Sequence, residues 1–343
     1  MKGSRVLIRE NFSDYSLNIP YKVYSFCEGR NGLFTTLERI RIKDNNAIIY
    51  YENPNKNFVR AFLNRNEKIK EYNNETIDRI EENKGYMPWE LLSNLSNKIN
   101  EDLEIYLDKV KWVNKFKIKP KNFEVVGKSK NLHIHQDALI YPNVVFDVSS
   151  GPIIIDKDVR ITSFSFLEGP LYIGPLSQID NARITGGTII GNSCRIGGEV
   201  ENSIISDFSN KHHEGFLGHS YVGRWVNIGA LATTSDLKNN YGVVKLTIAD
   251  KQISTNTLKF GAVIGDFSKI GIGTMINTGS IIDIGCNVVN SRVSGYIPPF
   301  TWADGKSKYR LDKFIIDTKK IMARRNQNLS SEMEVCLKAI YEE

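Results

Sequence analysis

A six-residue repeat of aliphatic residues in the middle of the chain constrains the fold more than any other feature. The repeat runs from about residue 125 to residue 297, and glycine often follows the aliphatic position. A period of six fits neither an α-helix nor a simple strand. It is typical of a β-helix, in which each rung buries an aliphatic residue and turns at small residues. The residues that keep this register are Ile134, Ile140, Phe146, Ile155, Ile161, Leu167, Ile173, Ile179, Ile184, Ile190, Ile196, Val222, Ile228, Ile264, Ile270, Ile276, Ile282 and Val288.

Two segments interrupt this repeat. Residues 210–230 contain three of the five histidines of the chain, His212, His213 and His219, set among glycines and small residues. Residues 233–261 form the second interruption. An insertion into a solenoid maps to a loop at one edge, which is often the functional edge. We therefore expect the functional residues at these interruptions, and no metal site, because the histidines lack cysteine or acidic partners in the sequence.

The sequence outside the repeat divides into three further regions. Residues 1–75 indicate short strands and one short helix around a glycine-containing loop. Residues 76–124 indicate a helical linker followed by a basic strand. Residues 301–343 indicate two helices that break near residues 326–330, with Ser330 or Ser331 as a cap. With the β-helix at residues 125–300, the predicted fold is mainly β, with a small α+β N-terminal region and C-terminal helices.

The linker carries two local signals. Pro88 lies at a plausible first turn of a helix, and lysines alternate with apolar residues from Lys115 to Lys119 with the period of a strand. We favour a solvated strand face for the lysines over a polyanion site, because Trp112 and Phe116 are not spaced like a stacking platform. The apolar stripe of the expected helix consists of Leu91, Leu92, Leu95, Ile99, Leu103 and Leu107.

Composition excludes several classes of protein. Of the 343 residues, 41% are apolar and 24% charged, as in globular proteins. The apolar runs are too short for membrane insertion, and the charged N-terminus predicts no export signal. The four cysteines are scattered, which argues against disulfides or zinc and fits a reducing cytoplasm. A net charge of +6 permits an anionic ligand but does not indicate nucleic acid.

Three segments resemble one enzyme family. "FLEGPLYIGPLSQIDNARITGGTIIGNSCRIGGEVENSII", "HEGFLGHSYVGRWVNIGA" and "LKFGAVIGDFSKIGIGT" are similar to the acyltransferase domain of bifunctional sugar-phosphate nucleotidylyltransferase/N-acetyltransferases, of the type that forms UDP-N-acetylglucosamine. The resemblance implies a left-handed β-helix. It also implies a homotrimer with active sites between subunits, acetyl-CoA as acyl donor and a small-molecule sugar acceptor.

The resemblance assigns roles to residues of the two interruptions and the following rung. The family's catalytic histidine falls on His213, and a histidine can take the proton of an acceptor amine near neutral pH. Asn227 would contact the acetyl donor, Ala230 would line the donor pocket and Thr274 would touch the coenzyme A arm. The structural alternatives are a turn residue for His213 and Thr274 and an asparagine ladder inside the solenoid for Asn227. His212 and His219 are expected to be structural or to contact a partner chain.

The chain departs from the family pattern on the acceptor side. Phe216 stands where the family has tyrosine, so the hydroxyl is missing. The family's phosphate-gripping arginine falls on Thr185. Lys211 is the candidate for a replacement phosphate-binding cation. The other departures are Glu201 and Asn202 in place of lysines, and Asp236 and Leu237 in place of an Asn-Tyr pair.

The N-terminal region carries a weaker resemblance. "EGRNGLFTTLERI" is similar to a segment of the family's nucleotidylyltransferase domain, which puts Arg30 and Gly32 on nucleotide-contacting positions. Only about 120 residues precede the solenoid, which is short for a nucleotide-binding sheet with both helical layers. We find no G-x-G-T-R loop and no acidic pair for Mg²⁺. The region therefore looks like a truncated remnant, and Mg²⁺ is expected only if it is a working nucleotidylyltransferase.

Three functions follow from these observations. The first is an acyl-CoA-dependent acyltransferase that acts on an amino sugar, sugar phosphate or sugar nucleotide, with His213 as general base. The second is a sugar-1-phosphate nucleotidylyltransferase homologue. The third is a non-catalytic trimeric scaffold or sensor, motivated by the departures on the acceptor side.

Overall fold

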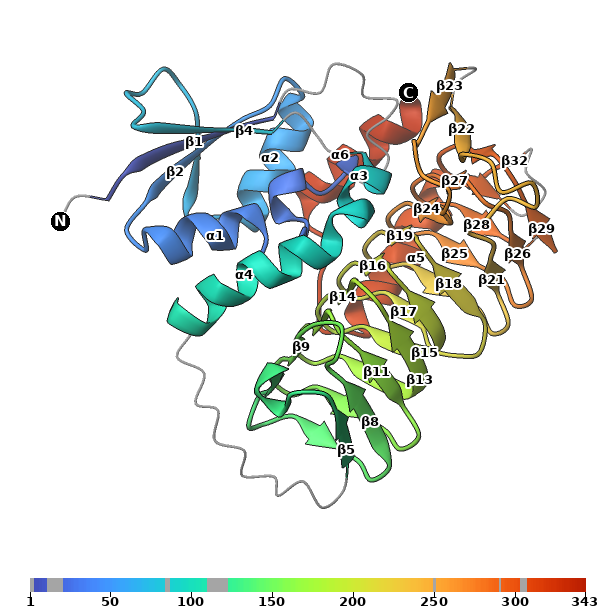
Figure 1. Ribbon diagram of the computed structural model, residues 1–343. Coiled ribbons are helices and arrows are strands. Elements are labelled where there is room, and N and C mark those ends of the chain that lie inside the picture. The colour runs from blue at the N-terminus through green and yellow to red at the C-terminus, as the bar shows by residue number, and fades with distance from the viewer. Residues whose placement is uncertain are drawn as a thin grey trace.

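The structure is a computed structural model that describes residues 3–10, 21–83, 87–109, 123–248, 251–289, 291–302 and 307–343. The basic strand that we expected at residues 115–119 lies outside these ranges. The repeat region forms a left-handed parallel β-helix with three flat sides (Figure 1). We call its sides face A, face B and face C, in the order in which each rung crosses them.

Each face is a ladder of short parallel strands, and β13 (Gln178–Thr185) and β15 (Arg195–Glu201) bend from face A onto face B. Face A continues through β7 (Leu139–Ile140), β10 (Arg160–Ile161), β17 (Asn210–Lys211), β20 (Asn227–Ile228), β25 (Lys269–Ile270), β28 (Asn287–Val288) and β31 (Thr301–Trp302). Face B contains β5 (Phe123–Val126), β8 (Val144–Asp147), β11 (Phe166–Glu168), β18 (Phe216–Gly218), β21 (Thr233–Thr234), β26 (Met275–Ile276) and β29 (Arg292–Val293). Face C contains β6 (Leu132–Ile134), β9 (Ile153–Ile155), β12 (Leu171–Ile173), β14 (Thr188–Ile190), β16 (Ile204–Ile205), β19 (Tyr221–Val222), β24 (Ala262–Ile264), β27 (Ser280–Ile282) and β30 (Tyr296–Ile297).

The interior of the prism holds the residues that the repeat predicted. Ile264, Ile270, Ile276, Ile282 and Val288 are all buried in one continuous core cluster. One rung cannot bury its own aliphatic side chains, so stacking of neighbouring rungs stabilises the whole solenoid. The expected register is confirmed.

The two interruptions of the repeat lie at corners of the prism. The histidine segment turns from face A to face B at residues 212–215. It then turns from face B to face C at His219 and Ser220. The insertion leaves the next rung at the same B–C corner and contains an antiparallel hairpin, β22 (Lys245–Ile248) and β23 (Lys251–Ser254). Two minor elements are the turn η4 (Ser129–Asn131) and β32 (Ser307–Lys308), which is antiparallel to β31.

The N-terminal region is a parallel sheet in the order β3-β2-β1-β4. That order matches the first four strands of the six-stranded doubly wound nucleotide-binding sheet, and these four are the strands of such a sheet found among the described residues. We expected one short helix in residues 1–75 and a helical linker from residue 76. The region instead has two α-helices, and its fourth strand lies inside the expected linker. The elements are β1 (Arg5–Glu10), η3 (Phe26–Glu28), α1 (Thr36–Lys43), β2 (Ile48–Glu52), α2 (Lys56–Arg65), β3 (Ile69–Glu71) and β4 (Arg79–Asn83).

Strand β4 could not be predicted from hydrophobic alternation. It is an edge strand whose side chains are mostly charged, and it is held by parallel backbone pairing with β1, from Val6 opposite Arg79 to Glu10 opposite Asn83. The helical part of the linker begins at α3 (Pro88–Ser93) and continues as α4 (Leu95–Lys109), with Pro88 in the first turn as expected.

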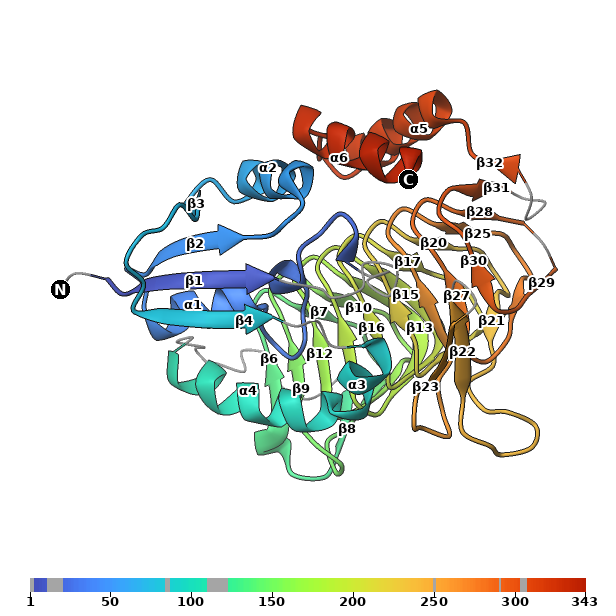
Figure 2. The ribbon, with the colours of Figure 1, turned by 90° about the horizontal axis from the view of Figure 1, so that it is seen from above.

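Helices α3 and α4 cover the outer side of face C (Figure 2). Leu92, Leu95 and Ile99 of the predicted stripe are buried there, in one cluster with outward-facing residues of face C such as Ile154 and Tyr172. Two further helices, α5 (Leu311–Ala323) and α6 (Ser331–Glu342), end the chain, and α6 packs against α2. The break between them and the cap at Ser330, whose hydroxyl accepts the N–H of Met333, are as predicted.

Candidate functional site

The A–B corner carries the histidine that the sequence singled out. It follows Lys211, which occupies a core position on face A opposite Ile196. The Lys211 ammonium donates hydrogen bonds to the carbonyl oxygens of Gly197, at 2.7 Å, and His213, at 3.0 Å. Burial lowers the pKa of Lys211 to about 8. The prediction that Lys211 binds a phosphate is therefore wrong for this conformation, because its ammonium lies inside the prism and holds the corner loop instead.

His213 itself is exposed on this corner loop. Its ring lies 5.0 Å from the ring of His212, centroid to centroid. No carboxylate among the described residues pairs with it. The other two histidines of the segment do have such partners: His212 contacts Asp180 and His219 contacts Asp236, each at 2.7 Å.

Two predicted donor-side residues lie next to this loop. Ala230 is on the same corner one rung further on, where Leu231 donates its N–H to the carbonyl of Glu214 at 2.8 Å. Asn227 lies on β20 of face A, in register with Asn210 and exposed. The asparagine neighbours therefore lie on the outside of the solenoid, not within it.

Thr274 does not reach this surface. It is fully buried and its hydroxyl donates to the carbonyl of Gly271 at 3.0 Å. The predicted contact with the coenzyme A arm is wrong for this conformation, and the structural alternative, a turn residue, describes it.

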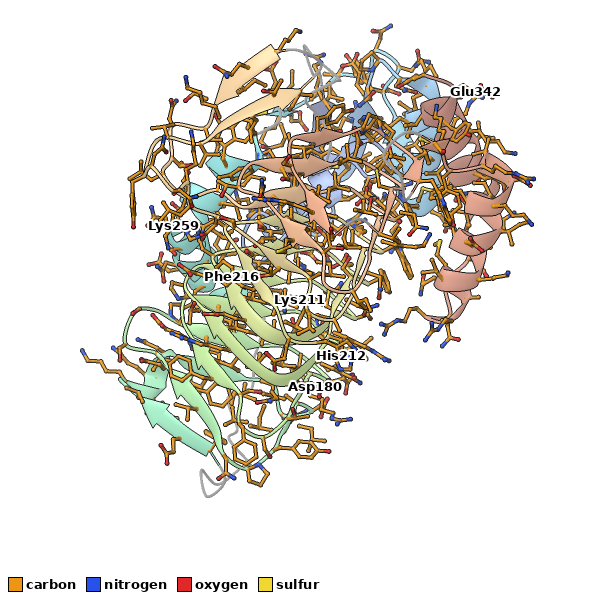
Figure 3. The ribbon with its side chains drawn as sticks, turned by 90° about the vertical axis from the view of Figure 1, so that its right-hand side faces the viewer. Asp180, Lys211, His212, Phe216, Lys259 and Glu342 are labelled. Atoms are coloured by element: carbon orange, nitrogen blue, oxygen red, sulfur yellow. The ribbon has the colours of Figure 1, made fainter. Side chains whose placement is uncertain are left out.

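Phe216 begins the strand of face B that follows the histidine loop. Its backbone pairs with Glu199 of the preceding rung, and its ring lies so close to Gly218 that an added Cβ there would come within 2.3 Å of it. In Figure 3, Phe216 lies between Lys259 on one side and His212 and Asp180 on the other. Face B thus separates two corners, each with a histidine–aspartate pair nearby.

The predicted nucleotide contacts, Arg30 and Gly32, are occupied by protein. The Arg30 guanidinium pairs with Glu38 at 3.1 Å and lies 5.2 Å from the ring centroid of Tyr172 on face C. At Gly32, with φ of 152°, a Cβ would lie 2.0 Å from a carboxylate oxygen of Asp102. These residues join the N-terminal region to the prism, so the expectation that they bind a nucleotide is not met in this structure.

A pocket at the B–C corner is the feature that sequence reasoning missed. It has a volume of about 440 Å³, is partly open to solvent and is lined by α3, the end of face B and the insertion. His219 lines it, together with Lys259 of the insertion. The available signals were the interrupted repeat and the tryptophan of "MPWELL", but nothing in the sequence shows that these segments meet.

Neither a metal cluster nor a membrane helix is found in the described part of the chain. No group of three or more histidine, cysteine, aspartate or glutamate side chains is arranged to hold a metal there. No helix there is both long and apolar enough to cross a bilayer. The four cysteines are free and buried.

The three-sided prism defines the chain as a hexapeptide-repeat protein. No family model matches it. Bifunctional protein GlmU from Jannaschia sp. (strain CCS1) is 32% identical over 160 residues, which cover 44% of this chain and 32% of that protein. A bifunctional sugar-1-phosphate nucleotidylyltransferase/acetyltransferase from Sulfurisphaera tokodaii is 28% identical over 239 residues, which cover 60% of this chain and 59% of that protein.

These relatives belong to the family that the motifs indicated, the bifunctional sugar-phosphate nucleotidylyltransferase/acetyltransferases, and the chain is similar to them over part of its length. The chain spans about a third of the length of the first relative and three fifths of the second. Among solved structures, LpxA from Acinetobacter baumannii is 15% identical, with 62% of this chain and 95% of that chain covered and a TM-score of 0.26. A TM-score this low carries no inference about function.

Proposed function

We propose that the chain is an acyltransferase that moves an acyl group from an acyl-CoA, acetyl-CoA in the first instance, to an amino sugar, sugar phosphate or sugar nucleotide. The observation that carries this proposal is the exposed His213 loop at the A–B corner of a hexapeptide prism, flanked by Ala230 and Asn227. The buried Lys211 fixes the backbone of this loop, so the imidazole projects from a defined position.

The chemistry needs one proton acceptor at this corner. The acceptor nitrogen or oxygen attacks the thioester carbonyl, its proton passes to a ring nitrogen of His213, and the carbon–sulfur bond breaks to release coenzyme A. Imidazole is the side chain that most often serves as a general base in enzymes. Asn227 is an exposed amide on face A, one rung beyond Asn210, that could contact the acyl donor.

A second and third copy of the chain complete the site in this proposal. The A–B corner exposes large apolar side chains: Phe164, Leu231 and Ile272 are 73%, 65% and 80% exposed. Leu231 and Ile272 lie on adjacent rungs, and exposed large apolar side chains along one edge are typical of a protein contact. A neighbouring copy would bury it and supply the polar partner that His213 lacks within the described part of one chain.

The first prediction concerns this assembly. We expect light scattering to report a trimer, and we expect the double substitution Leu231→Asp with Ile272→Asp to give monomers, because two carboxylates cannot be buried unpaired. Ile316→Asp on α5, where the side chain is 44% exposed, is the matched control and should leave the trimer intact. A monomeric wild type would contradict an active site shared between copies.

The second prediction concerns the base. We expect His213→Ala to lower thiol release from acetyl-CoA by about 100-fold or more, measured with a panel of amino sugars, their 1-phosphates and their nucleotides. His212→Gln is the control, since that histidine is held by Asp180. Undiminished turnover in His213→Ala would exclude His213 as the base.

The two alternatives have their own outcomes. Pyrophosphate release from UTP or dTTP with a hexose 1-phosphate and Mg²⁺ would favour the nucleotidylyltransferase, although the occupied positions of Arg30 and Gly32 speak against it. A trimer that shows no coenzyme A binding by calorimetry would favour the scaffold or sensor.

A further inference from the structure

The pocket at the B–C corner is built by the parts of the chain that do not repeat. Helix α3 supplies Trp89 and Leu92, and the insertion supplies Leu237, Leu258 and Phe260. The rings of Trp89 and Phe260 pack edge to face with centroids 5.7 Å apart. The volume of about 440 Å³ lies in the range of small-molecule sites, which are mostly apolar with a few convergent polar groups.

His219 is the first of these polar groups. Its Nδ1 lies 2.7 Å from Oδ2 of Asp236, and both side chains are largely buried. His219 lines the pocket, whereas Asp236 does not. The carboxylate therefore lies behind the ring, and no hydrogen-bond partner of Nε2 is found among the described residues. A carboxylate that accepts Nδ1–H fixes the neutral tautomer in which Nε2 is a proton acceptor.

Lys259 is the second polar group, and it is arranged in the same way. Its ammonium lies 3.1 Å from a carboxylate oxygen of Glu201. Lys259 lines the pocket while Glu201 does not. The pocket thus receives one base and one cation, each held from behind by a carboxylate. Burial acts to raise the pKa of Asp236, but the hydrogen bond with His219 and the nearby charge of Lys259 act against it, and the pKa of Asp236 is lowered.

We propose that this pocket binds an aromatic alcohol, with the ring between the apolar walls and the hydroxyl on His219. The O–H proton passes to Nε2, and the oxygen, now negative, is stabilised by the Lys259 ammonium. An acceptor nitrogen oriented by a carboxylate, beside a cation, is the arrangement that activates a hydroxyl. The apolar side chains that reach the pocket, such as Leu258, favour a ligand with an apolar body, because burial of apolar surface is favourable.

This pocket lies across face B from the His213 corner, and its lining includes Asn202 and Leu237, two of the positions at which the chain departs from the family's acceptor side. The strand β18 lies between them, and Figure 3 shows Lys259 and His212 on opposite sides of Phe216. The inference does not rest on the proposed acyltransferase, and it is tested without any acyl donor.

The probe is 4-nitrophenol, which becomes yellow when it loses its proton. On titration with protein at constant pH below its own pKa, we expect saturable binding and a rise in the yellow phenolate form. A cation and a base within contact distance lower the pKa of a bound acid by about one unit or more, so the phenolate-to-phenol ratio should rise about tenfold. His219→Gln should remove this rise, and Lys259→Met should reduce it.

The matched control is His212→Gln. It removes a histidine of the same segment with the same 2.7 Å aspartate contact, but outside the pocket, and it should behave as wild type. Leu258→Trp fills the pocket from an exposed position, which spares the fold, and it should abolish binding. Circular dichroism checks that each variant is folded.

Three outcomes would overturn the inference. The first is no saturable binding by the wild type. The second is binding that Leu258→Trp leaves unchanged, which would mean that the probe binds elsewhere. The third is binding in the pocket with the same colour change in His219→Gln, which would exclude His219 as the proton acceptor.

Discussion

Replacing Arg65 by methionine is expected to lower the free energy of unfolding by about 3–5 kcal/mol at pH 7, because it leaves a buried carboxylate without its partner. Arg65 ends α2 and forms two parallel hydrogen bonds to Glu28, at 3.0 and 2.8 Å. Both side chains are mostly buried. Burial acts to raise the pKa of Glu28, but the charge and hydrogen bonds of Arg65 outweigh it and keep that pKa below its usual value.

The same helix offers a matched control. Lys56 begins α2 and contacts Glu71 at 2.7 Å, but both side chains are exposed. Lys56→Met should cost less than about 1 kcal/mol, as exposed ion pairs do. Both variants are compared by urea unfolding at one protein concentration. The loss in Arg65→Met should shrink toward pH 4, where the unpaired Glu28 can take a proton. An equal loss of unfolding free energy in the two variants would show that burial does not make the Arg65–Glu28 pair more important for stability than an exposed pair.

The β-helix could be predicted from the sequence because the burial of each residue follows from the pattern of its near neighbours in the chain. A residue such as Ile270 is buried by Ile264 and Ile276 on the neighbouring faces and by the rungs on either side, so a local pattern determines its place. The C-terminal helices were predictable for the same reason, since a polar side chain at Ser330 and the apolar spacing of each helix are local signals. Strand β4 carries no such signal, because its charged residues follow the backbone of β1.

The candidate site was predictable only in part. Family resemblance named His213 and Ala230 as site residues, and the structure has both on one corner. It could not show that Lys211 points inward, because a lysine at an aliphatic position of the repeat can occupy the core only if backbone carbonyls receive its ammonium. The hydroxyl of Thr274 turns inward because the carbonyl of Gly271 accepts its hydrogen bond. The guanidinium of Arg30 packs over the ring of Tyr172, which the sequence does not show. The B–C pocket could not be predicted from the sequence, because Trp89, His219 and Lys259 come together only when α3 packs on face C.

Replacement of the buried Asp266 is the second substitution for which we expect a large change in stability. It lies at the corner between faces C and A, and its Oδ1 accepts the backbone N–H of Arg224 at 2.7 Å. Its Oδ2 has no hydrogen-bond partner among the described residues. Burial raises the pKa of Asp266 to about 7, against the hydrogen bond and charge of Arg224, which lower it. The positive charge of Arg65 also lowers the pKa of Asp266, and the negative charge of Glu28 raises it.

A raised carboxyl pKa makes the folded state bind more protons than the unfolded state between about pH 4 and pH 7. The contribution of Asp266 to stability therefore falls as the pH rises through this window. At higher pH the carboxyl is ionised, and the folded state bears the full free-energy cost of a buried charge. Asp266→Asn removes that cost. We expect the variant to be more stable than the wild type by about 4 kcal/mol at pH 8, since each pKa unit corresponds to about 1.4 kcal/mol, and to differ little at pH 4, where the wild-type carboxyl is protonated.

Urea unfolding at the two pH values measures this difference directly. Asp312→Asn is the control, because Asp312 is exposed and its ion-pair partner among the described residues is Arg310, at the surface, so its replacement should change stability little at either pH. The sign of the stability difference between Asp266→Asn and the wild type at pH 8 shows whether the ionised carboxylate destabilises the fold. If Asp266→Asn is less stable than the wild type at pH 8, the ionised carboxylate is stabilised by Arg224 and Arg65 more than burial opposes it. In that case the cluster at this corner is a satisfied ion network, and the charge of Asp266 contributes to holding the N-terminal region on the prism.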